Sequence, residues 1–386
     1  MSLVKKRYYF YDFFKTQDGI PSFYGSVKSK SAQTVLYDSF SNSTENQPVC
    51  KINHIPDYLQ IEYNNEDNLN IKSLNRDLGY AIDLNNVSDI NSYVNQQFKK
   101  GRTIRRYVSK LESSFNITYK RYYGDIPKDV YDELLQCLFK MVQKRFVQLN
   151  DINEQINDDI RWKTTLEETY ALIKEKRASL FVIYEDDKPI VISIGHHWGS
   201  VFYYVMCSFD IDYAKFALGH VNFYKQLEWC INEGYEIFDC GLGEYHYKKR
   251  WSNKTYILLQ QVICNKGNIL DELIANVEIT LTLIKKNLAL EKLKLYLKSI
   301  KKTFIKTNYK ALECNISYIN EQDSNLQDYT KINIKNDDYA FLRKILFDFL
   351  YSKNERKEDV LVFKNVTNNN TYFFKGKKNM MQCDIL

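Results

Sequence analysis

The order of the predicted elements between residues 115 and 265 constrains the fold of this 386-residue chain more than any other feature. Hydrophobic patterns of period two and period 3.6 follow one another as strand, two helices, three strands, helix, strand, short helix and strand. Their ranges are 115–123, 128–148, 165–177, 179–186, 188–198, 200–210, 222–234, 235–243, 244–252 and 255–264. Strands interleaved with helices in this way predict an α/β (α+β) fold with a mixed sheet.

Turn and capping residues support these limits. Pro127 directly precedes the helix 128–148, at a position where proline is compatible with a first helical turn. The three consecutive strands are separated by Asp186-Asp187-Lys188 and by Gly199-Ser200, which are typical of hairpin turns. Gly234 stands where the helix 222–234 ends, and glycine commonly terminates helices. The middle of the domain is therefore expected to contain a strand meander followed by a helix.

The N-terminal portion is less regular. Residues 1–95 contain short strand-like runs separated by Asn, Asp and Ser. These runs lie at 8–14, 33–40, 58–63 and 80–84. Residues 88–111 then follow a helical pattern, with Ile104, Val108 and Leu111 on one apolar stripe.

The C-terminal portion has a different character. Residues 268–300 form a long helical pattern, and its apolar face carries Leu270, Ile274, Val277, Leu281 and Ile284. We interpret it as a helix packed on the rest of the protein, with binding to a membrane surface as the alternative. Residues 305–386 are polar and mixed, and they include a hairpin-like segment at 360–377.

Composition narrows the classes of function. The formal net charge of +6 suits a polyanionic ligand such as a nucleotide, and it equally suits an ordinary soluble surface. No basic block is dense enough to predict nucleic-acid binding. The eight cysteines are scattered without a C-x-x-C pair, and the five histidines show no metal-ligand spacing. No secretory signal and no apolar run of membrane-spanning length occurs, so we expect a cytoplasmic protein with reduced thiols and no metal site.

Three stretches resemble a known family. Residues 98–123, 208–243 and 243–251 are similar in order and spacing to the CelD-like branch of the GNAT superfamily, which is related to FemAB-type transferases with two tandem GNAT-like folds. The resemblance covers about 95–265. It implies a degenerate GNAT-like domain at 1–95, an acyl-CoA-binding GNAT domain at 96–265, and a helical and mixed C-terminal extension at 266–386.

The resemblance also implies where acyl-CoA binds. In such folds two parallel strands, here 200–210 and 235–243, diverge and expose backbone amides to the pantetheine arm. The following helix directs its N-terminus at the pyrophosphate, where unpaired amides and the helix dipole favour anions. The implied contacts are Phe209, Lys215, Ala217, Leu218, Gly219 and His220. This loop has less Gly and Arg than is usual in the superfamily, which keeps a non-catalytic binding protein on the same fold as an alternative.

Four residues are candidates for the transfer step. Tyr247 is the expected acid for the departing thiolate, and Glu244 is expected to contact the substrate. Asp239 lies among apolar neighbours, and two roles stay open for it: acting on the amine, or serving as a buried partner of an arginine. At most one of His196 and His197 can face the gap because adjacent strand residues point to opposite sides. His197 is the candidate base, and a structural role is the alternative.

The acceptor is predicted from the resemblance. Members of this branch acylate amino groups of nucleotide-linked sugars used for surface polysaccharides, including lipopolysaccharide. Aromatic and basic residues could stack on a sugar and pair with a diphosphate. These candidates are Arg106, Tyr203, His246, Lys248 and Arg250, whereas Arg102 and Lys110 are interpreted as a solvated helix face. Acyl-CoA is then a co-substrate, with no permanently bound cofactor. A FemAB-type transferase that uses aminoacyl-tRNA is the nearer alternative.

Overall fold

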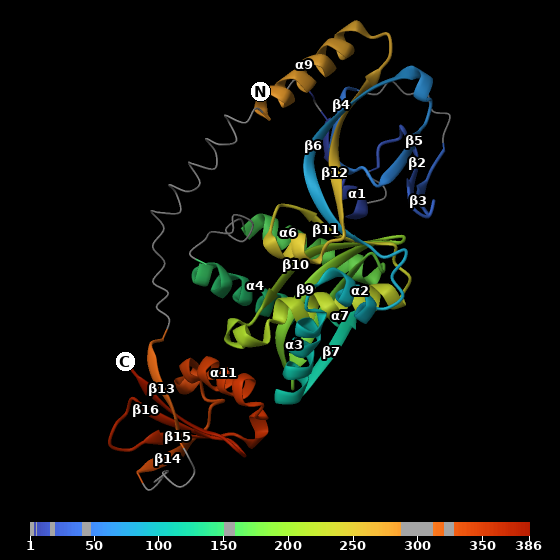
Figure 1. Cartoon of the computed structure of the whole chain (residues 1–386). Helices are drawn as coiled ribbons and strands as arrows, with labels where there is room; N and C mark the ends of the chain where they lie inside the picture. Colours follow the sequence, from blue (N-terminus) through green and yellow to red (C-terminus); the bar gives the residue numbers. More distant parts are fainter. Residues whose placement is uncertain are drawn as a thin grey trace.

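The computed structural model describes residues 4, 6–15, 20–40, 48–149, 159–286, 312–319 and 328–386. Its largest element is a nine-stranded mixed sheet in the middle of the molecule (Figure 1). In spatial order its strands are β1 (Lys6–Tyr9), β4 (Cys50–Pro56), β12 (Lys254–Asn265), β6 (Leu69–Asp83), β11 (Ile237–Leu242), β10 (Val201–Phe209), β9 (Lys188–Trp198), β8 (Ala178–Glu185) and β7 (Ile117–Tyr122). The predicted mixed α/β fold is confirmed.

Two smaller antiparallel sheets accompany it. The three-stranded sheet contains β3 (Val35–Asp38), β2 (Tyr24–Ser29) and β5 (Leu59–Tyr63). The five-stranded sheet contains β13 (Cys314–Ile319), β17 (Met380–Ile385), β16 (Thr371–Lys375), β15 (Leu361–Asn365) and β14 (Tyr329–Ile332). The predicted hairpin at 360–377 is therefore present as β15 and β16. We call residues 312–319 and 328–386 the C-terminal module.

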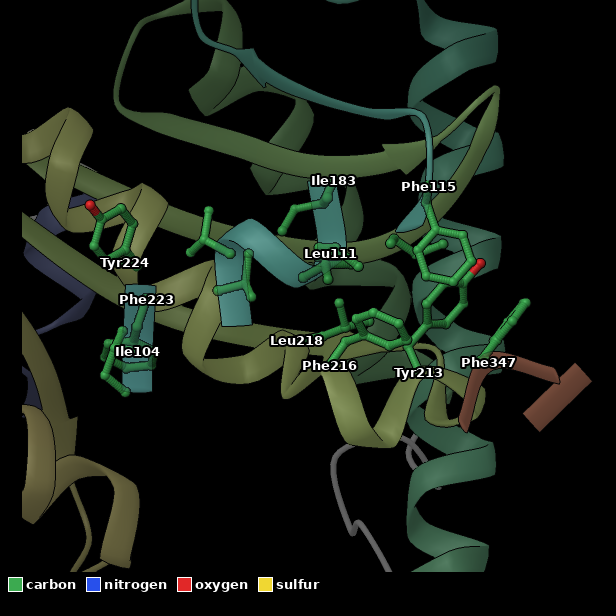
Figure 2. Close-up of a cluster of buried hydrophobic side chains, with 14 of the residues drawn as sticks. Ile104, Leu111, Phe115, Ile183, Tyr213, Phe216, Leu218, Phe223, Tyr224 and Phe347 are labelled. Atoms are coloured by element: carbon green, nitrogen blue, oxygen red, sulfur yellow. The ribbon is translucent and has the colours of Figure 1, made fainter. Parts of the chain in front are cut away.

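Helices cover both faces of the β7–β11 part of the large sheet. The α-helices of the described residues are α1 (Asp12–Lys15), α2 (Ile90–Gln97), α3 (Gly101–Ser114), α4 (Lys128–Leu149), α6 (Asp159–Lys174), α7 (Leu218–Asn232), α8 (His246–Trp251), α9 (Ile269–Lys285) and α11 (Arg343–Lys353). Helices α2, α3 and α7 share one apolar layer with this part of the sheet, and α4 packs on the opposite face. Figure 2 shows Leu111 of α3 and Leu218 of α7 lying in that layer. The predicted stripe of α3 is buried, because Ile104 and Leu111 are both 0% exposed.

Most central elements have the predicted type. The three consecutive strands are β8, β9 and β10, and β9 has the predicted bounds. Gly234 adopts a φ of +76° just after α7, a conformation that glycine accommodates without steric cost. The second helix begins earlier than predicted, at Asp159 rather than Thr165, and ends at Lys174.

The predictions for the N-terminal portion are partly wrong. The predicted strand at 8–14 is divided into β1 and the single turn α1. The predicted helix at 88–111 is two helices, interrupted after Phe98 and resumed at Gly101. Strands β2 and β4 were not predicted because buried polar residues hide their period; Lys51 and Asn53 of β4 are 8% and 7% exposed. Their polar atoms are hydrogen-bonded, which makes the burial tolerable.

Helix α9 packs on the large sheet through a different face from the one predicted. Ala275, Glu278 and Thr282 are its buried residues, whereas Leu270 is 71% exposed. The Lys51 ammonium donates to the Glu278 carboxylate at 2.7 Å, so a buried ion pair holds the helix. The apolar periodicity of α9 therefore predicted the wrong face to be buried. Residues 287–300 of the predicted helix lie outside the described residues.

The large sheet joins two portions of the chain. Strand β6, from residues 69–83, lies between β11 and β12, which come from residues 237–265. The predicted domain boundaries at 95 and 265 stay predictions. Figure 1 shows α9 at one end of the molecule and the C-terminal module at the other. Within the described part of the chain, no helix combines the length and the apolar character that crossing a membrane requires.

Candidate active site at the divergence of two strands

Strands β10 and β11 pair over a short distance and then diverge. Their parallel register covers only three pairs, and the last of them joins Tyr203 to Asp239. Beyond this point β10 stays paired with β9 and β11 with β6. A register irregularity falls at the divergence in both strands, between Tyr204 and Met206 in β10 and between Asp239 and Gly241 in β11. We call this point the apex. The expected divergence is confirmed, and the irregularities account for it because bulges bend strands.

The chain leaving β10 leads to the N-terminus of α7. A 3-10 helix, η3 (Ile211–Phe216), is followed by Ala217, whose φ of +52° turns the chain into α7. Among the described residues, the amides of Leu218 and Gly219 have no backbone acceptor, whereas the amide of His220 donates to the Ala217 carbonyl. Unpaired amides at the start of a 15-residue helix can bind an anion. A Cβ added at Gly219 would meet only Phe209, at 3.5 Å.

The six predicted acyl-CoA contacts are brought together, but two of them already have partners. The Lys215 ammonium lies 3.7 Å from Asp348 and 3.4 Å from the Ser352 hydroxyl of α11. His220 accepts a hydrogen bond from the Trp251 indole at 3.0 Å. Burial and the neighbouring Arg250 lower the pKa of His220 to about 4, so its ring is neutral near pH 7. Among the described groups of this loop, the amides at the start of α7 thus remain available to an anion.

Helix α8 is fixed to the end of β11. Lys248, which was predicted to contact substrate, is 7% exposed and donates to the Leu242 carbonyl at 2.6 Å. Its ammonium therefore holds α8 beside the end of β11 rather than facing a ligand. Glu244 pairs with Lys249 at 2.5 Å on the surface. Arg250 is exposed, and its guanidinium lies over the Phe98 ring at 5.2 Å.

Tyr247 lies over the gap between the two strands. Its ring packs edge-on against Phe223 of α7, with ring centroids 5.6 Å apart. Burial raises the pKa of Tyr247, and so do Cys240 of β11 and Cys207 of β10, which lie near it on opposite sides of the gap. The hydroxyl is therefore protonated near neutral pH, and it has no hydrogen-bond partner among the described residues. It is 39% exposed, so a ligand can reach it.

Asp239 is an anchor of the apex. It is 0% exposed, and its carboxylate accepts hydrogen bonds from Tyr58 at 2.6 Å, from Tyr256 at 2.7 Å and from the Gly241 amide at 2.6 Å. Among the described residues its partners are thus two tyrosines and a backbone amide, and no arginine pairs with it. Burial raises the pKa of Asp239, against the hydrogen bonds from Tyr58 and Tyr256, which lower it.

The two adjacent histidines face opposite sides of the sheet. His196 lies opposite Tyr203 in the register, and its Nδ1 is 2.6 Å from the Tyr11 hydroxyl. His197 lies beneath α7, with Nδ1 2.7 Å from the Tyr235 hydroxyl and Nε2 2.8 Å from the Ser179 hydroxyl. Burial lowers the pKa of His197 well below its ordinary value. His197 is thus a neutral, fully hydrogen-bonded residue, and the histidine beside Tyr203 is His196.

Two of the remaining basic residues, Arg106 and Lys110, contact the C-terminal module. Arg106 donates to the Tyr351 hydroxyl at 3.3 Å. Lys110, predicted to lie on a solvated face, donates to the Tyr351 carbonyl at 2.9 Å and to Asn354, so that prediction is wrong. Arg102 and His246 are exposed. The module also packs on η3, with the Tyr213 and Phe347 rings 4.4 Å apart (Figure 2).

Sequence reasoning missed several polar residues around the apex. Tyr58 and Tyr256 were overlooked because aromatic residues are common in this chain, and nothing marks these two in the sequence. Asn222 and Gln226 could have been found: they are four residues apart on α7, both 0% exposed, on a helix face that otherwise packs apolar residues. In the described ranges, no group of three or more His, Cys, Asp or Glu side chains could hold a metal ion.

Comparisons with known proteins concern the same part of the chain. Among solved structures, FemX is similar with a TM-score of 0.40 and 10% identity, covering 59% of this chain and 74% of FemX. The C-terminal domain of a putative lysylphosphatidylglycerol synthetase from Agrobacterium fabrum gives a TM-score of 0.37 and 13% identity, covering 60% and 72%. L-PGS from Bacillus licheniformis gives 0.35 and 11%, covering 61% and 72%. These similarities are distant, and nothing about the chemistry of this chain follows from them.

A model of a protein family matches part of the sequence. No curated protein matches the sequence significantly. The model described as "Acetyltransferase (GNAT) domain" matches residues 99–249, which include β7–β11, α7 and most of α8. The matched range thus contains the two diverging strands, the start of α7 and Tyr247. Residues 99–249 of this mixed α/β protein are therefore similar to a GNAT-type domain.

Proposed function

We propose that this protein is an N-acyltransferase that moves an acyl group from acyl-CoA, its co-substrate, to the amino group of a nucleotide-linked sugar for surface polysaccharide synthesis. The observation that carries the proposal is the divergence of β10 and β11 after the Tyr203–Asp239 pair, with the start of α7 at the end of β10 and Tyr247 over the gap. The divergence and the helix terminus would serve a protein that only binds acyl-CoA as well as an enzyme. The protonated Tyr247 hydroxyl at the gap is a feature that transfer uses and binding alone does not need.

Binding of the donor follows from the backbone. Beyond Tyr203, β10 pairs on one side only, with β9, among the described strands, so its other edge offers amide and carbonyl groups to the pantetheine arm. The amides of Leu218 and Gly219 would hold the pyrophosphate. These two features lie at successive points of one chain segment, and acyl-CoA is an extended molecule with amides and a pyrophosphate in the same order.

The transfer requires few groups. The amine nitrogen attacks the thioester carbon, the carbon–nitrogen bond forms, and the carbon–sulfur bond breaks with its electron pair remaining on sulfur. Tyr247 then gives its proton to the thiolate and regains one, through water, from the amine. Asp239 would maintain the shape of the apex rather than remove the amine proton, because its carboxylate is buried and already accepts hydrogen bonds from two tyrosines.

The acceptor part of the proposal rests on the residues at the mouth of the gap. Tyr245 is 62% exposed and stacks with Tyr247 at a centroid distance of 6.0 Å, which offers an aromatic surface to a sugar ring. His246 and Arg250 are exposed on the same short helix and could pair with a diphosphate. Tyr203 is half-buried at the apex and could contact the sugar that carries the amine.

The test is transfer by the purified full-length protein, followed by mass spectrometry. Acetyl-CoA and longer acyl-CoAs are offered together with nucleotide-linked amino sugars, and we expect an acylated sugar nucleotide and free CoA in equal amounts. Absence of a thermal shift with millimolar acetyl-CoA, together with no product, would contradict the proposal. Transfer from aminoacyl-tRNA instead would assign the protein to FemAB-type chemistry.

A further inference from the structure

A continuous line of buried hydrogen bonds runs beneath α7 to the apex. It starts at Arg121 of β7, crosses Gln226 of α7 and Ser193 of β9, and returns to Asn222 of α7. The Asn222 amide ends the line at Tyr204 and Cys207 of β10. The successive bonds are Arg121 Nη2 to Gln226 Oε1 (2.7 Å), Gln226 Nε2 to Ser193 Oγ (2.7 Å), Ser193 Oγ to Asn222 Oδ1 (3.1 Å), Asn222 Nδ2 to the Tyr204 hydroxyl (2.9 Å) and Asn222 Nδ2 to Cys207 Sγ (3.5 Å).

The arginine fixes the orientation of Gln226, and contact distances then give the direction of the remaining bonds. A guanidinium can only donate, so the carbonyl oxygen of Gln226 must face Arg121 and the amide NH₂ must face Ser193. The Ser193 hydroxyl has one proton, and its shorter contact as a donor is to Asn222, at 3.1 Å against 3.4 Å to the Phe181 carbonyl. The Asn222 NH₂ group must then face Tyr204. Every donor therefore points from Arg121 towards the apex.

The charge of Arg121 has no carboxylate partner among the described residues. Its guanidinium stacks on Trp229, 3.8 Å from the ring centroid, and its Nε has no hydrogen-bond partner in the same part of the chain. Trp229 lies in the last turn of α7, where the helix dipole favours a cation. Burial lowers the pKa of Arg121 only to about 10, so the group stays charged near neutral pH. Arg121 also donates through Nη1 to the Ser179 hydroxyl, which is hydrogen-bonded to Nε2 of the neutral His197.

The line ends where the proposed reaction takes place. Tyr204 and Cys207 flank the irregularity of β10, and both lie close enough to Tyr247 to affect its electrostatic environment or be affected by it. Because Tyr204 accepts from Asn222, its own proton is available, and it is directed at the Cys207 sulfur. Thiol sulfur is a weak acceptor. A carbonyl oxygen placed in the gap would therefore compete well for this hydrogen bond.

We propose that Tyr204 donates a hydrogen bond to the acyl carbonyl oxygen during transfer, and that Arg121, Gln226 and Asn222 are positioning residues that turn its proton towards the gap. The inference rests on the proposed acyl transfer. As the amine attacks, the carbonyl oxygen gains negative charge, and a fixed donor stabilises it most at that moment. Tyr204 keeps its proton throughout, and Tyr247 separately protonates the departing sulfur.

The decisive variant is Gln226→Glu. A carboxylate has no donor, so Ser193 would have to donate to Glu, Asn222 would have to turn its NH₂ group to Ser193, and Tyr204 would then donate to Asn222 instead of the gap. The same change gives Arg121 a carboxylate partner, so the melting temperature should stay equal or rise. We expect kcat to fall roughly ten to a hundredfold while the KM for acyl-CoA changes little, which is the pattern of a lost transition-state contact.

Two further variants complete the test. Tyr204→Phe removes the donor itself and should lower kcat by a similar factor. Tyr224→Phe is the control, since the Tyr224 hydroxyl bonds only to Asn91 among the described residues and is outside the line. A Gln226→Glu protein with normal kcat would overturn the role of Arg121 and Gln226. A Tyr204→Phe protein with normal kcat would overturn the proposal as a whole.

A readout that needs no acyl transfer separates this inference from the proposed function. The donors converge on Cys207, so their loss should raise its thiol pKa and slow its alkylation by iodoacetamide, measured by peptide mass spectrometry. Cys137, on α4 at the opposite face, is the internal control. If the wild type transfers no acyl group, the proposed function and the catalytic part of this inference both fail. Unchanged Cys207 alkylation in Gln226→Glu and Tyr204→Phe would separately refute the direction of the hydrogen bonds.

Discussion

The Tyr58 hydroxyl donates a 2.6 Å hydrogen bond to the Asp239 carboxylate, and it joins residues 181 positions apart in the chain. Tyr58 precedes β5, whereas Asp239 makes the last pair between β10 and β11. The same carboxylate accepts from the Gly241 amide, at the irregularity where β11 diverges from β10. The N-terminal portion of the chain therefore contributes directly to the shape of the apex.

Replacing Asp239 by Asn tests the anchor role through the pH dependence of stability. Burial raises the pKa of Asp239 in the folded state, so its contribution to folding is fully present below the unfolded pKa and is lost as pH rises through the folded pKa. Asn does not titrate. We therefore expect the melting temperature of Asp239→Asn, relative to the wild type, to improve as pH is raised from 4 towards 7.

The kinetic result should agree with the anchor role. If Asp239 removed the amine proton, Asp239→Asn would flatten the acid limb of the pH–rate profile. With the carboxylate held by Tyr58 and Tyr256, we expect the acid limb to remain. A flattened limb, with a melting temperature that follows the wild type at every pH, would return Asp239 to the role of base.

Gly219→Val tests the pyrophosphate site. A Cβ at this position meets only Phe209 at an ordinary contact distance, so the fold should tolerate the change. The branched side chain should nevertheless crowd the free amides of Leu218 and Gly219 and weaken acyl-CoA binding by roughly tenfold or more, equivalent to about 1.4 kcal/mol. Isothermal titration with acetyl-CoA measures it, with Ala171→Val on the exposed surface of α6 as the control. Equal affinity in both variants would place the pyrophosphate elsewhere.

Lys357→Met tests the attachment of the C-terminal module. Glu185 is 4% exposed and accepts from Lys357 of the module and from Tyr213 of η3. Removing the ammonium leaves a buried carboxylate with one partner, which should cost about 2 kcal/mol because Lys357 is itself partly exposed. Thermal unfolding should show a lower melting temperature, and the added change Glu185→Gln should restore most of it. No loss in the single variant would show that the pair contributes little.

The sequence predicted the central part of the fold because its signals are local. The strand meander and the helix that ends at Gly234 depend on period, turns and caps, which a single sequence displays. The divergence of the two strands was expected from the family resemblance and is present. The partners of Asp239 could not be predicted, since Tyr58 and Tyr256 reach it through the pairing of distant strands. The buried face of α9 was misassigned for a related reason: Glu278 is buried because Lys51, from β4, neutralises it.

The candidate site also contains residues that the sequence could indicate and residues that it could not. Tyr247 and the start of α7 follow β11 and β10 closely in sequence, so the family resemblance, which rests on the order of the elements, was enough to select them. His197 and Lys248 were chosen for their chemical type, and both are occupied by structural hydrogen bonds that depend on tertiary contacts. Arg121 was not chosen, because a lone arginine in a predicted strand gives no sign that a helix will cover it.

Tyr247→Phe is the direct test of the acid. The change removes only a hydroxyl that has no partner among the described residues, and the ring keeps its packing against Phe223. Melting temperature and acyl-CoA affinity should therefore stay close to wild type, while turnover falls roughly ten to a thousandfold, as expected when a general acid is lost. The measurement is single-turnover acyl transfer, in which product release cannot mask the chemical step.

The neighbouring Tyr245 supplies the matched control. It stacks on Tyr247 and is 62% exposed, but it caps α8 and lies farther out from the gap. Tyr245→Phe should retain near-normal turnover, and any change should appear in the KM for the acceptor, whose sugar it is proposed to contact. Wild-type single-turnover rates in Tyr247→Phe would remove this residue from the proton path. Since we propose that Tyr204 keeps its proton, water would then have to protonate the thiolate. In that case the rate should become sensitive to the pKa of the leaving thiol.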